Sequence, residues 1–237
     1  RFLLLIRRQN NRLGLLLSYD LETGATKELA REVDWRACWS PDQKRVAFSR
    51  IGPGDWLPTL HVLNVETGQV EWRLPFNGLG QLAMHWVEST DEIYFTEGFH
   101  PKSLIDIYKV KFRDEKSRTL VAGGTGSQTH PRPSPNGRWL AYSASEGGYS
   151  IRIKNLSKPG SNDLRVPGHG IGPLWSGDGK EIYYRSLRSI RKVGVKETLK
   201  GLELTAPVEL FSGDFVESTQ WDRNVMFDPH RKRFLLS

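Results

Sequence analysis

Short apolar runs alternate with turn-forming residues along the whole chain, and residues 39–48 give the clearest example. Trp39 ends one extended segment, and Ser40-Pro41-Asp42 supplies the preset φ and the local side-chain hydrogen bonds of a turn. Val46-Ala47-Phe48 then begins the next apolar segment. Sustained helical periodicity is absent throughout. The pattern therefore predicts an all-β chain of short strands joined by tight turns.

This strand–turn–strand unit recurs in altered form, and the copies align without gaps. Their first positions are Trp39, Trp86, Pro133, Trp175 and Phe227, which lie 42 to 52 residues apart. A second hairpin follows in the first repeats, with Glu-Thr-Gly turns at residues 22–24 and 66–68. Each repeat therefore offers four antiparallel strands, and a period of this length is typical of the four-stranded blades of a β-propeller.

The alignment also predicts where the blades begin and end. Residues 1–8 align with Arg45 onward, so the first repeat starts on its second strand. We expect a single propeller domain over residues 1–237, about five blades' worth. The boundaries are a partial blade at 1–38, blades at 39–85, 86–132, 133–174 and 175–226, and the start of a further blade at 227–237. Residues 196–206 form an insertion in the last full repeat.

Both ends of the chain align with the second strand of the repeat, and this bears on whether the propeller ring closes. It favours a fragment of a six-bladed ring, with four full blades in an open arc. The alternative is a closed five-bladed ring in which residues 224–227 pair beside residues 2–7. Both alternatives stay open at the level of the sequence.

Composition excludes several classes of protein. With 38% hydrophobic residues the 237-residue chain can bury a substantial core. The single cysteine, Cys38, excludes an internal disulfide framework and is expected to be a buried apolar thiol. There is no apolar run of about 18 residues, so we expect no membrane insertion. The net charge of +7 would favour an anionic partner only if it were concentrated on one face.

Catalytic and cofactor motifs are also missing from the sequence. It contains no Gly-x-Ser-x-Gly run for a serine nucleophile. The six histidines lack paired metal-ligand spacing, so we expect no metal site. The glycine-rich run at residues 123–127 lacks the lysine of a phosphate-binding loop. We therefore expect neither a cofactor nor an active site.

One segment concentrates positive charge. Residues 180–200 hold seven lysines and arginines against two glutamates. Nucleic-acid binding would require stacking aromatics interleaved with these cations, and Tyr183 and Tyr184 are better placed for the core. A solvated outer edge, whose charges block edge-to-edge sheet pairing, is the favoured interpretation.

The unit Trp39-Ser40-Pro41-Asp42, its copy Ser134-Pro135-Asn136-Gly137 and the ending at residues 227–236 resemble the repeats of TolB-like β-propellers. These WD-repeat-like bacterial modules are usually six-bladed, and the resemblance covers essentially the whole chain. It implies a non-catalytic module that binds a protein or peptide, with a periplasmic or extracytoplasmic location. The alternative that it implies is the propeller portion of a larger protein, either a prolyl-oligopeptidase-like hydrolase or the sensory part of a kinase or transcriptional regulator.

Register within the repeat predicts a binding site. Trp39, Trp86, Trp175 and Phe227 share one repeat position and are expected in the core. The residues that deliver each first strand converge at one mouth of a propeller channel, and binding hot spots favour aromatic residues and arginine. The aromatic, arginine and histidine residues near that position are Trp35, Arg36, His130, Trp221 and Arg223. We expect them to anchor an acidic segment or a C-terminal carboxylate.

Overall fold

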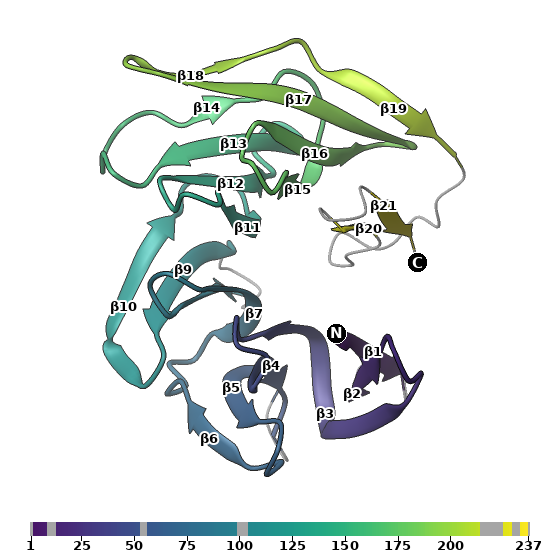
Figure 1. Ribbon diagram of the computed structural model, residues 1–237. Helices are drawn as coiled ribbons and strands as arrows, with labels where there is room; N and C mark the ends of the chain where they lie inside the picture. Colours follow the sequence, from purple (N-terminus) through teal and green to yellow (C-terminus); the bar gives the residue numbers. More distant parts are fainter. Residues whose placement is uncertain are drawn as a thin grey trace. The chain divides into compact units, whose positions relative to one another are not determined.

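The computed structural model describes residues 2–8, 13–52, 56–98, 104–213, 225–228 and 233–236, and at residues 8, 35, 225–228 and 233–236 it describes the backbone alone. Every helix or strand in these ranges is a β-strand, which confirms the all-β prediction (Figure 1). The chain divides into two compact units, Arg1–Gly123 and Gly124–Ser237.

The first unit begins with a six-stranded antiparallel sheet whose strands follow one another in sequence order. They are β1 (Phe2–Arg8), β2 (Gly14–Asp20), β3 (Thr26–Trp39), β4 (Arg45–Arg50), β5 (Thr59–Asn64) and β6 (Val70–Arg73). β3 serves two repeats, because it pairs with β2 as far as Val33 and with β4 from Val33 onward. The last strand of the first repeat and the first strand of the second are therefore continuous.

A four-stranded antiparallel sheet completes the first unit. Its strands are β7 (Gly80–Val87), β8 (Glu92–Gly98), β9 (Asp106–Lys111) and β10 (Asp114–Ala122). A core cluster joins the two sheets, with Ala47 and Val62 from the first and Trp86, Ile93 and Phe95 from the second. Burying a side chain such as Phe95 stabilises the fold by about 1.5–3 kcal/mol. Cys38 is partly buried and packs against this cluster.

The second unit repeats the blade pattern. One sheet contains β11 (Gln128–Pro133), β12 (Trp139–Ala144), β13 (Ser150–Asn155) and β14 (Leu164–Arg165). The next contains β15 (Ile171–Trp175), β16 (Glu181–Ser186), β17 (Ser189–Thr198), β18 (Gly201–Leu204) and β19 (Val208–Ser212). The final pair is β20 (Val225–Asp228) and β21 (Arg233–Leu236).

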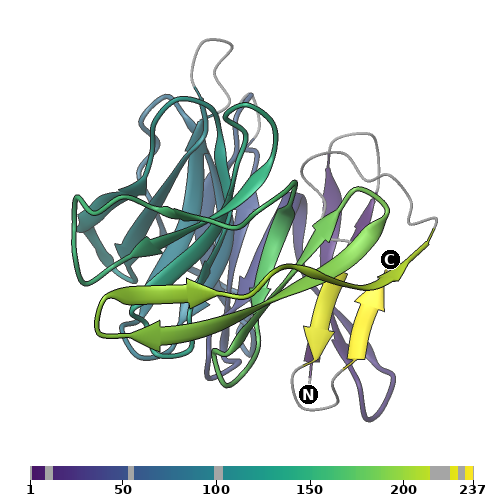
Figure 2. The ribbon, with the colours of Figure 1, turned by 90° about the horizontal axis from the view of Figure 1, so that it is seen from above.

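The predicted insertion is a hairpin. β17 pairs with β19 through Ser189–Lys192 and with β18 through Val195–Thr198. β17 and β18 therefore form a long two-stranded arm that extends the blade, as Figure 2 shows. Leu202 and Leu204 of this arm pack against the core cluster that joins the two larger sheets of the unit.

The Ser-Pro-Asp turn is held by side-chain hydrogen bonds. Ser40 Oγ donates to Asp42 Oδ1 at 2.6 Å, and the backbone N–H of Lys44 donates to the same oxygen at 3.0 Å. The N–H of Arg45 donates to Ser40 Oγ at 2.9 Å. These contacts confirm the local side-chain hydrogen bonds that the sequence predicts for this turn.

The aligned turns of the second unit keep the same three hydrogen bonds. They join Ser134 to Asn136, and Ser176 to Asp178. The copy after Trp86 has no serine at this place, and its turn differs. Val87 pairs with Glu92, and Asp91 takes the left-handed conformation with φ of 53°.

Candidate functional site

A β-bulge interrupts the first strand of each of four blades. The pairing register shifts between Val33 and Ala37, between Ala83 and His85, between Thr129 and Arg132, and between Ile171 and Leu174. Bulges re-aim side chains and increase local twist. Two of the residues expected to bind a partner, Arg36 and His130, lie in these bulges.

Arg36 and His130 are each only 4% exposed. Arg36 belongs to the first unit and His130 to the second. His130 has a φ of 54°, a region that histidine enters more readily than most residues, and its Nδ1 lies 2.9 Å from Thr129 Oγ1. At this burial neither side chain offers a partner much surface, and their role in binding stays a prediction.

The other three expected binding residues are Trp35, Trp221 and Arg223. The side chain of Trp35 and the whole of Trp221 and Arg223 lie outside the described residues. Their part in an anchoring patch likewise stays a prediction.

Gln81 ties together three segments where β7 begins. Its backbone N–H donates to Pro58 O at 2.8 Å, and its side-chain Oε1 accepts from the N–H of Leu60 at 3.1 Å. Its Nε2 donates to Pro75 O at 3.2 Å, and Gln81 is only 1% exposed. One buried glutamine therefore holds both the β4–β5 and the β6–β7 connections of the first unit.

An ion pair between a partly exposed arginine and a buried glutamate continues this network. Gln81 Nε2 lies 3.4 Å from Glu97 Oε1, and the fully buried Glu97 carboxylate pairs with Arg118. The Arg118 guanidinium lies 4.7 Å from the centre of the Tyr108 ring. Burial, reinforced by the Glu97 charge, raises the pKa of the Tyr108 hydroxyl. Removing Arg118 would leave the buried Glu97 charge uncompensated, so the pair fixes β8 against β10.

Large apolar side chains are exposed on the connections at this end of the first unit. Trp56 in the β4–β5 connection is 77% exposed, Phe76 in the β6–β7 connection 53%, and Leu104 in the β8–β9 connection 51%. We call Trp56, Phe76 and Leu104 the loop surface. Exposed aromatic side chains held on fixed loops are the residues that most often carry binding energy.

The loop surface was not predicted from the sequence, because register arguments point only to residues directly ahead of each first strand. A signal was available. Trp56 follows Gly52-Pro53-Gly54-Asp55, and Phe76 lies between Pro75 and Asn77-Gly78. Glycine and proline mark loops, and an aromatic residue inside such a run has no strand face on which to be buried.

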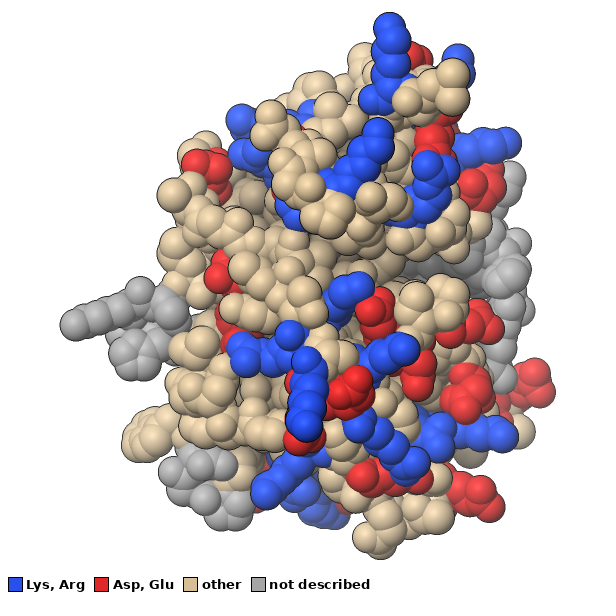
Figure 3. Space-filling model, turned by 90° about the vertical axis from the view of Figure 1, so that its left-hand side faces the viewer, with Lys and Arg blue, Asp and Glu red and all other residues tan. Residues whose placement is uncertain are grey.

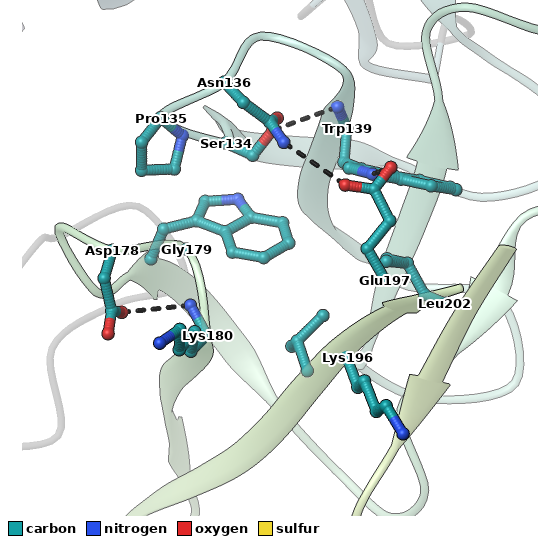
Figure 4. Close-up of a pocket in the computed structure, with 12 residues that line it drawn as sticks. Ser134, Pro135, Asn136, Trp139, Asp178, Gly179, Lys180, Lys196, Glu197 and Leu202 are labelled. Carbon is teal, nitrogen blue, oxygen red and sulfur yellow. Dashed lines mark hydrogen bonds between the residues drawn. The ribbon is translucent and has the colours of Figure 1, made fainter. Parts of the chain in front are cut away.

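The second unit contains a pocket of about 340 Å³ where two turns meet the β17–β18 arm (Figure 4). We call it the hairpin pocket. Its apolar walls are Pro135, Trp139, Trp175, Val195 and Leu202, and its polar rim includes Asn136, Asp178, Lys180 and Glu197. Hydrogen bonds from the Ser176 hydroxyl and from the Lys180 N–H hold the pKa of Asp178 below its usual value. The volume suits a small apolar group, such as one side chain of a peptide.

Glu197 connects the arm to the neighbouring blade across the hairpin pocket. Its Oε1 accepts from Trp139 Nε1 at 3.3 Å and pairs with Arg138 at 2.8 Å. Its Oε2 accepts from Asn136 Nδ2 at 3.5 Å, and Figure 4 shows the carboxylate directed at Asn136 and Trp139. The inserted arm is therefore fixed as one wall of the pocket.

The described residues give few signs of other chemistry. They contain no cluster of three His, Cys, Asp or Glu side chains placed to hold a metal ion. Nor do these ranges include a helix that is long and apolar enough to cross a membrane. On the face drawn in Figure 3, acidic and basic side chains are interspersed. Ion pairs among the described residues include Arg45–Glu71 and Lys109–Glu92.

Comparison with known proteins shows which fold the chain has. No family model and no curated protein sequence matches the chain. Among solved structures, TolB from Acinetobacter baumannii matches 90% of the chain with a TM-score of 0.67 and 17% identity. A TolB candidate from Agrobacterium tumefaciens matches 85% with a TM-score of 0.64 and 18% identity. A puromycin-hydrolysing peptidase from Mycobacterium tuberculosis matches 90% with a TM-score of 0.60 and 17% identity.

The chain accounts for different shares of these proteins. It covers 78% of the Agrobacterium protein, 52% of the Acinetobacter TolB and 38% of the peptidase. At such identities the likeness shows the fold and leaves activity open. The strand order, the repeated turn and these neighbours agree: the chain has the fold of TolB-like β-propellers.

Proposed function

We propose that the chain is a non-catalytic propeller module that binds a protein or a peptide. The observation that carries this proposal is the loop surface, where Trp56 and Phe76 are 77% and 53% exposed on connections held by Gln81. Keeping aromatic side chains in water is unfavourable, whereas covering them with a partner removes apolar area from water. The likeness to TolB structures supports the same class of function.

The sequence-derived anchoring patch is retained within this proposal. Trp35, Arg36, His130, Trp221 and Arg223 would bind an acidic segment or a C-terminal carboxylate. Because Arg36 and His130 are buried, the first contact in this scheme is made by the loop surface. By the same resemblance to TolB-like propellers, we also propose a periplasmic location.

A second candidate function is the propeller portion of a larger enzyme or sensor. The peptidase from Mycobacterium tuberculosis and the tricorn protease contain the matched region within much longer chains, of which this chain covers 38% and 27%. In such a protein the loop surface would face a neighbouring domain. The flanking gene sequence discriminates, because a hydrolase domain downstream favours gating and a kinase or winged-helix domain upstream favours sensing.

A peptide selection tests binding directly. The immobilised protein is challenged with a phage-displayed random peptide library, and enriched peptides are titrated by fluorescence anisotropy. Trp56→Ala and Phe76→Ala should each weaken binding by about 2 kcal/mol. Leu187→Ala is the matched control, because Leu187 is 74% exposed but lies in the second unit.

The outcomes separate the alternatives. A library that yields no enriched peptide would contradict a peptide-binding module. Enriched peptides that bind Trp56→Ala and Phe76→Ala normally would move the site away from the loop surface. Trp35→Ala and Arg223→Ala in the same titration then test the anchoring patch, where a loss of about 2 kcal/mol each is expected.

A further inference from the structure

The hairpin pocket has a counterpart in the first unit, because the repeat places equivalent residues at both sites. Phe112 and Val195 share one repeat position. The N–H of Phe112 donates to Asp91 O at 3.1 Å, and the N–H of Val195 donates to Lys180 O at 2.7 Å. Both acceptors lie five residues after the first position of their aligned units. The two sites can therefore be compared residue by residue.

An aromatic ring fills this site in the first unit. Phe112 lies in the turn between β9 and β10 and packs against the core cluster of the unit. The centre of its ring lies 5.3 Å from that of Trp86 and 5.9 Å from that of Trp72. The Arg45 guanidinium lies 5.3 Å from the same ring centre. A phenyl ring therefore fills the space between the two sheets of the first unit.

The second unit has no such ring at this site. Its counterparts of Trp86 and Arg45 are Trp175 and Trp139, each at the same spacing from the first position of its aligned unit. Val195 stands at the position of the phenylalanine, and its short side chain has no ring to place between the two tryptophans. The cavity of about 340 Å³ lies here, lined by Val195 and by both tryptophans. The hairpin pocket therefore corresponds to the place of an aromatic side chain that the second unit lacks.

The tryptophan walls of the hairpin pocket are already fixed by the protein. Trp139 Nε1 donates to Glu197 Oε1 at 3.3 Å, and Trp175 Nε1 donates to Arg132 O at 2.9 Å. Figure 4 shows the indole of Trp139 beside the Glu197 carboxylate. Because both indole N–H groups are satisfied, a ligand needs to offer them no acceptor, and an apolar ring suits the walls. Preformed walls also lower the cost of ordering the site on binding.

Charge at the pocket favours an acidic group beside that ring. Lys180 and Lys196 line the pocket and form no ion pair among the described residues. Of the two carboxylates there, Glu197 pairs with Arg138 at 2.8 Å. The other, Asp178, accepts hydrogen bonds from the hydroxyl and the N–H of its own turn. Three cations thus stand against two carboxylates, and a carboxylate on the ligand complements the surplus.

We infer that the hairpin pocket binds the aromatic side chain of a peptide in which an acidic residue neighbours the aromatic one. The ring would take the place that Phe112 fills in the first unit. Aromatic pairs prefer ring centres about 4.5–7 Å apart, and Phe112 keeps to this range against both of its tryptophans. The inference goes beyond the proposed function, because it names the side chain that is recognised and places it in the second unit, away from the loop surface.

The probe is a pentapeptide with blocked ends and the sequence Gly-Asp-Phe-Asp-Gly. Its binding is followed through the indole N–H resonances of the ¹⁵N-labelled protein, with two signals assigned from Trp139→Phe and Trp175→Phe. Both signals should move on titration. Replacing the peptide's phenylalanine by alanine should weaken binding about tenfold or more, because no ring then enters the pocket. Replacing both of its aspartates by lysine should also weaken binding.

Val195→Phe tests the comparison between the two units. The new ring should occupy the pocket as Phe112 does, so the peptide should bind about tenfold more weakly or worse, while the urea midpoint stays at or above that of the parent chain. Val65→Phe is the matched control and should leave the affinity unchanged. Val65 has the same repeat position in the first unit, where its N–H donates to Lys44 O at 2.9 Å.

Several results would overturn the inference. They are unmoved Trp139 and Trp175 signals at millimolar peptide, equal affinity for the phenylalanine and alanine peptides, and equal affinity of the parent chain and folded Val195→Phe. The signals of the parent chain decide the matter if Val195→Phe does not fold. Tighter binding of the lysine peptide would overturn the acidic neighbour. Sedimentation that shows a second copy of the chain filling the pocket would overturn the peptide as its occupant.

The same probe keeps this site apart from the loop surface. Trp56→Ala and Phe76→Ala should bind the pentapeptide like the parent chain, because both residues belong to the first unit. A loss of binding in these variants, with the Trp139 and Trp175 signals unmoved, would assign the pentapeptide to the loop surface and overturn the inference while supporting the proposed function.

Discussion

Ser49 Oγ accepts a hydrogen bond from the backbone N–H of Ala83 at 2.8 Å, and this contact joins the second strand of one blade to the bulged first strand of the next. Both residues are buried, with exposures of 0% and 1%. The second unit repeats the device, because Ser143 Oγ accepts from the N–H of Gly172 at 2.9 Å. The bulge turns one N–H out of its own sheet, and a serine on the neighbouring sheet satisfies it.

Ser49→Ala should therefore lower the free energy of unfolding by about 1–3 kcal/mol, because it leaves the buried N–H of Ala83 without an acceptor. Urea denaturation followed by tryptophan fluorescence measures this change. Ser157→Ala is the control, since Ser157 is exposed and uses only its backbone in the turn. Equal midpoints for the two variants would contradict a structural role for the Ser49 contact.

The Ser-Pro-Asp turn gives a second prediction. Asp42→Ala should cost on the order of 1 kcal/mol, because Ser40 Oγ and the N–H of Lys44 lose their shared acceptor. Asp42→Asn should cost much less, since Asn136 makes the same contacts in the second unit. Thermal unfolding of both variants tests this, and similar losses for Ala and Asn would show that charge outweighs hydrogen bonding here.

These turns also predict how stability depends on pH. Hydrogen bonds from the Ser40 and Ser176 hydroxyls lower the folded-state pKa of Asp42 and of Asp178 below the unfolded value of about 3.9. The ionised form therefore stabilises the fold above that value, and the contribution is lost as the pH falls through the folded pKa. Urea midpoints measured between about pH 6 and pH 3 should fall less in Asp42→Asn/Asp178→Asn than in the parent chain. A parallel fall in both proteins would assign the acid sensitivity to other carboxylates.

Much of the fold could be predicted because each repeat has turn-forming residues at fixed positions. The Ser-Pro-Asp and Glu-Thr-Gly turns place strand ends within a few residues, as β12 and β16 show. The continuity of β3 could not be predicted, because its bulge between Val33 and Ala37 depends on pairing with two different strands. The spacing of turn residues in the sequence predicts where strands end, whereas the position of a bulge depends on the strand that pairs with it.

The site was harder to predict for a related reason. Register within the repeat points to Arg36 and His130 as binding residues, but exposure depends on the bulge and on packing, and both side chains are buried. Nothing in the sequence singles out Gln81, yet its side-chain amide contacts both Pro75 and Leu60. Long-range hydrogen bonds of this kind leave no periodic signal in the chain.

Gln81→Ala should loosen the loop surface. The variant loses the bonds to Leu60 N–H and Pro75 O, so the free energy of unfolding should fall by about 1–3 kcal/mol. Amide hydrogen exchange should accelerate in residues 74–79. Gln128→Ala is the comparison at the equivalent repeat position, where Oε1 accepts no hydrogen bond among the described residues. Unchanged exchange in residues 74–79 would mean that other contacts, such as the hydrogen bond from the Leu74 N–H to Leu60 O, hold the connection.

The β17–β18 arm gives the last prediction. Glu197 receives hydrogen bonds from Trp139 Nε1 and Asn136 Nδ2 and pairs with Arg138, so it is the arm's polar attachment to the neighbouring blade. Glu197→Ala should leave the cross-strand pairs of residues 195–198 and 201–204 intact but let the arm open more often, because packing of Leu202 and Leu204 then acts alone.

Amide exchange in the arm should therefore accelerate in Glu197→Ala while exchange in β12 and β16 stays unchanged. Glu203→Ala is the control, since Glu203 lies in the same arm, is exposed and makes no ion pair among the described residues. A double-mutant cycle of Arg138→Gln and Glu197→Gln should give a coupling of about 0.2–1 kcal/mol, as expected for a partly exposed pair. Equal arm exchange in the Glu197 and Glu203 variants would show that apolar packing, with no help from the carboxylate, forms the wall of the hairpin pocket.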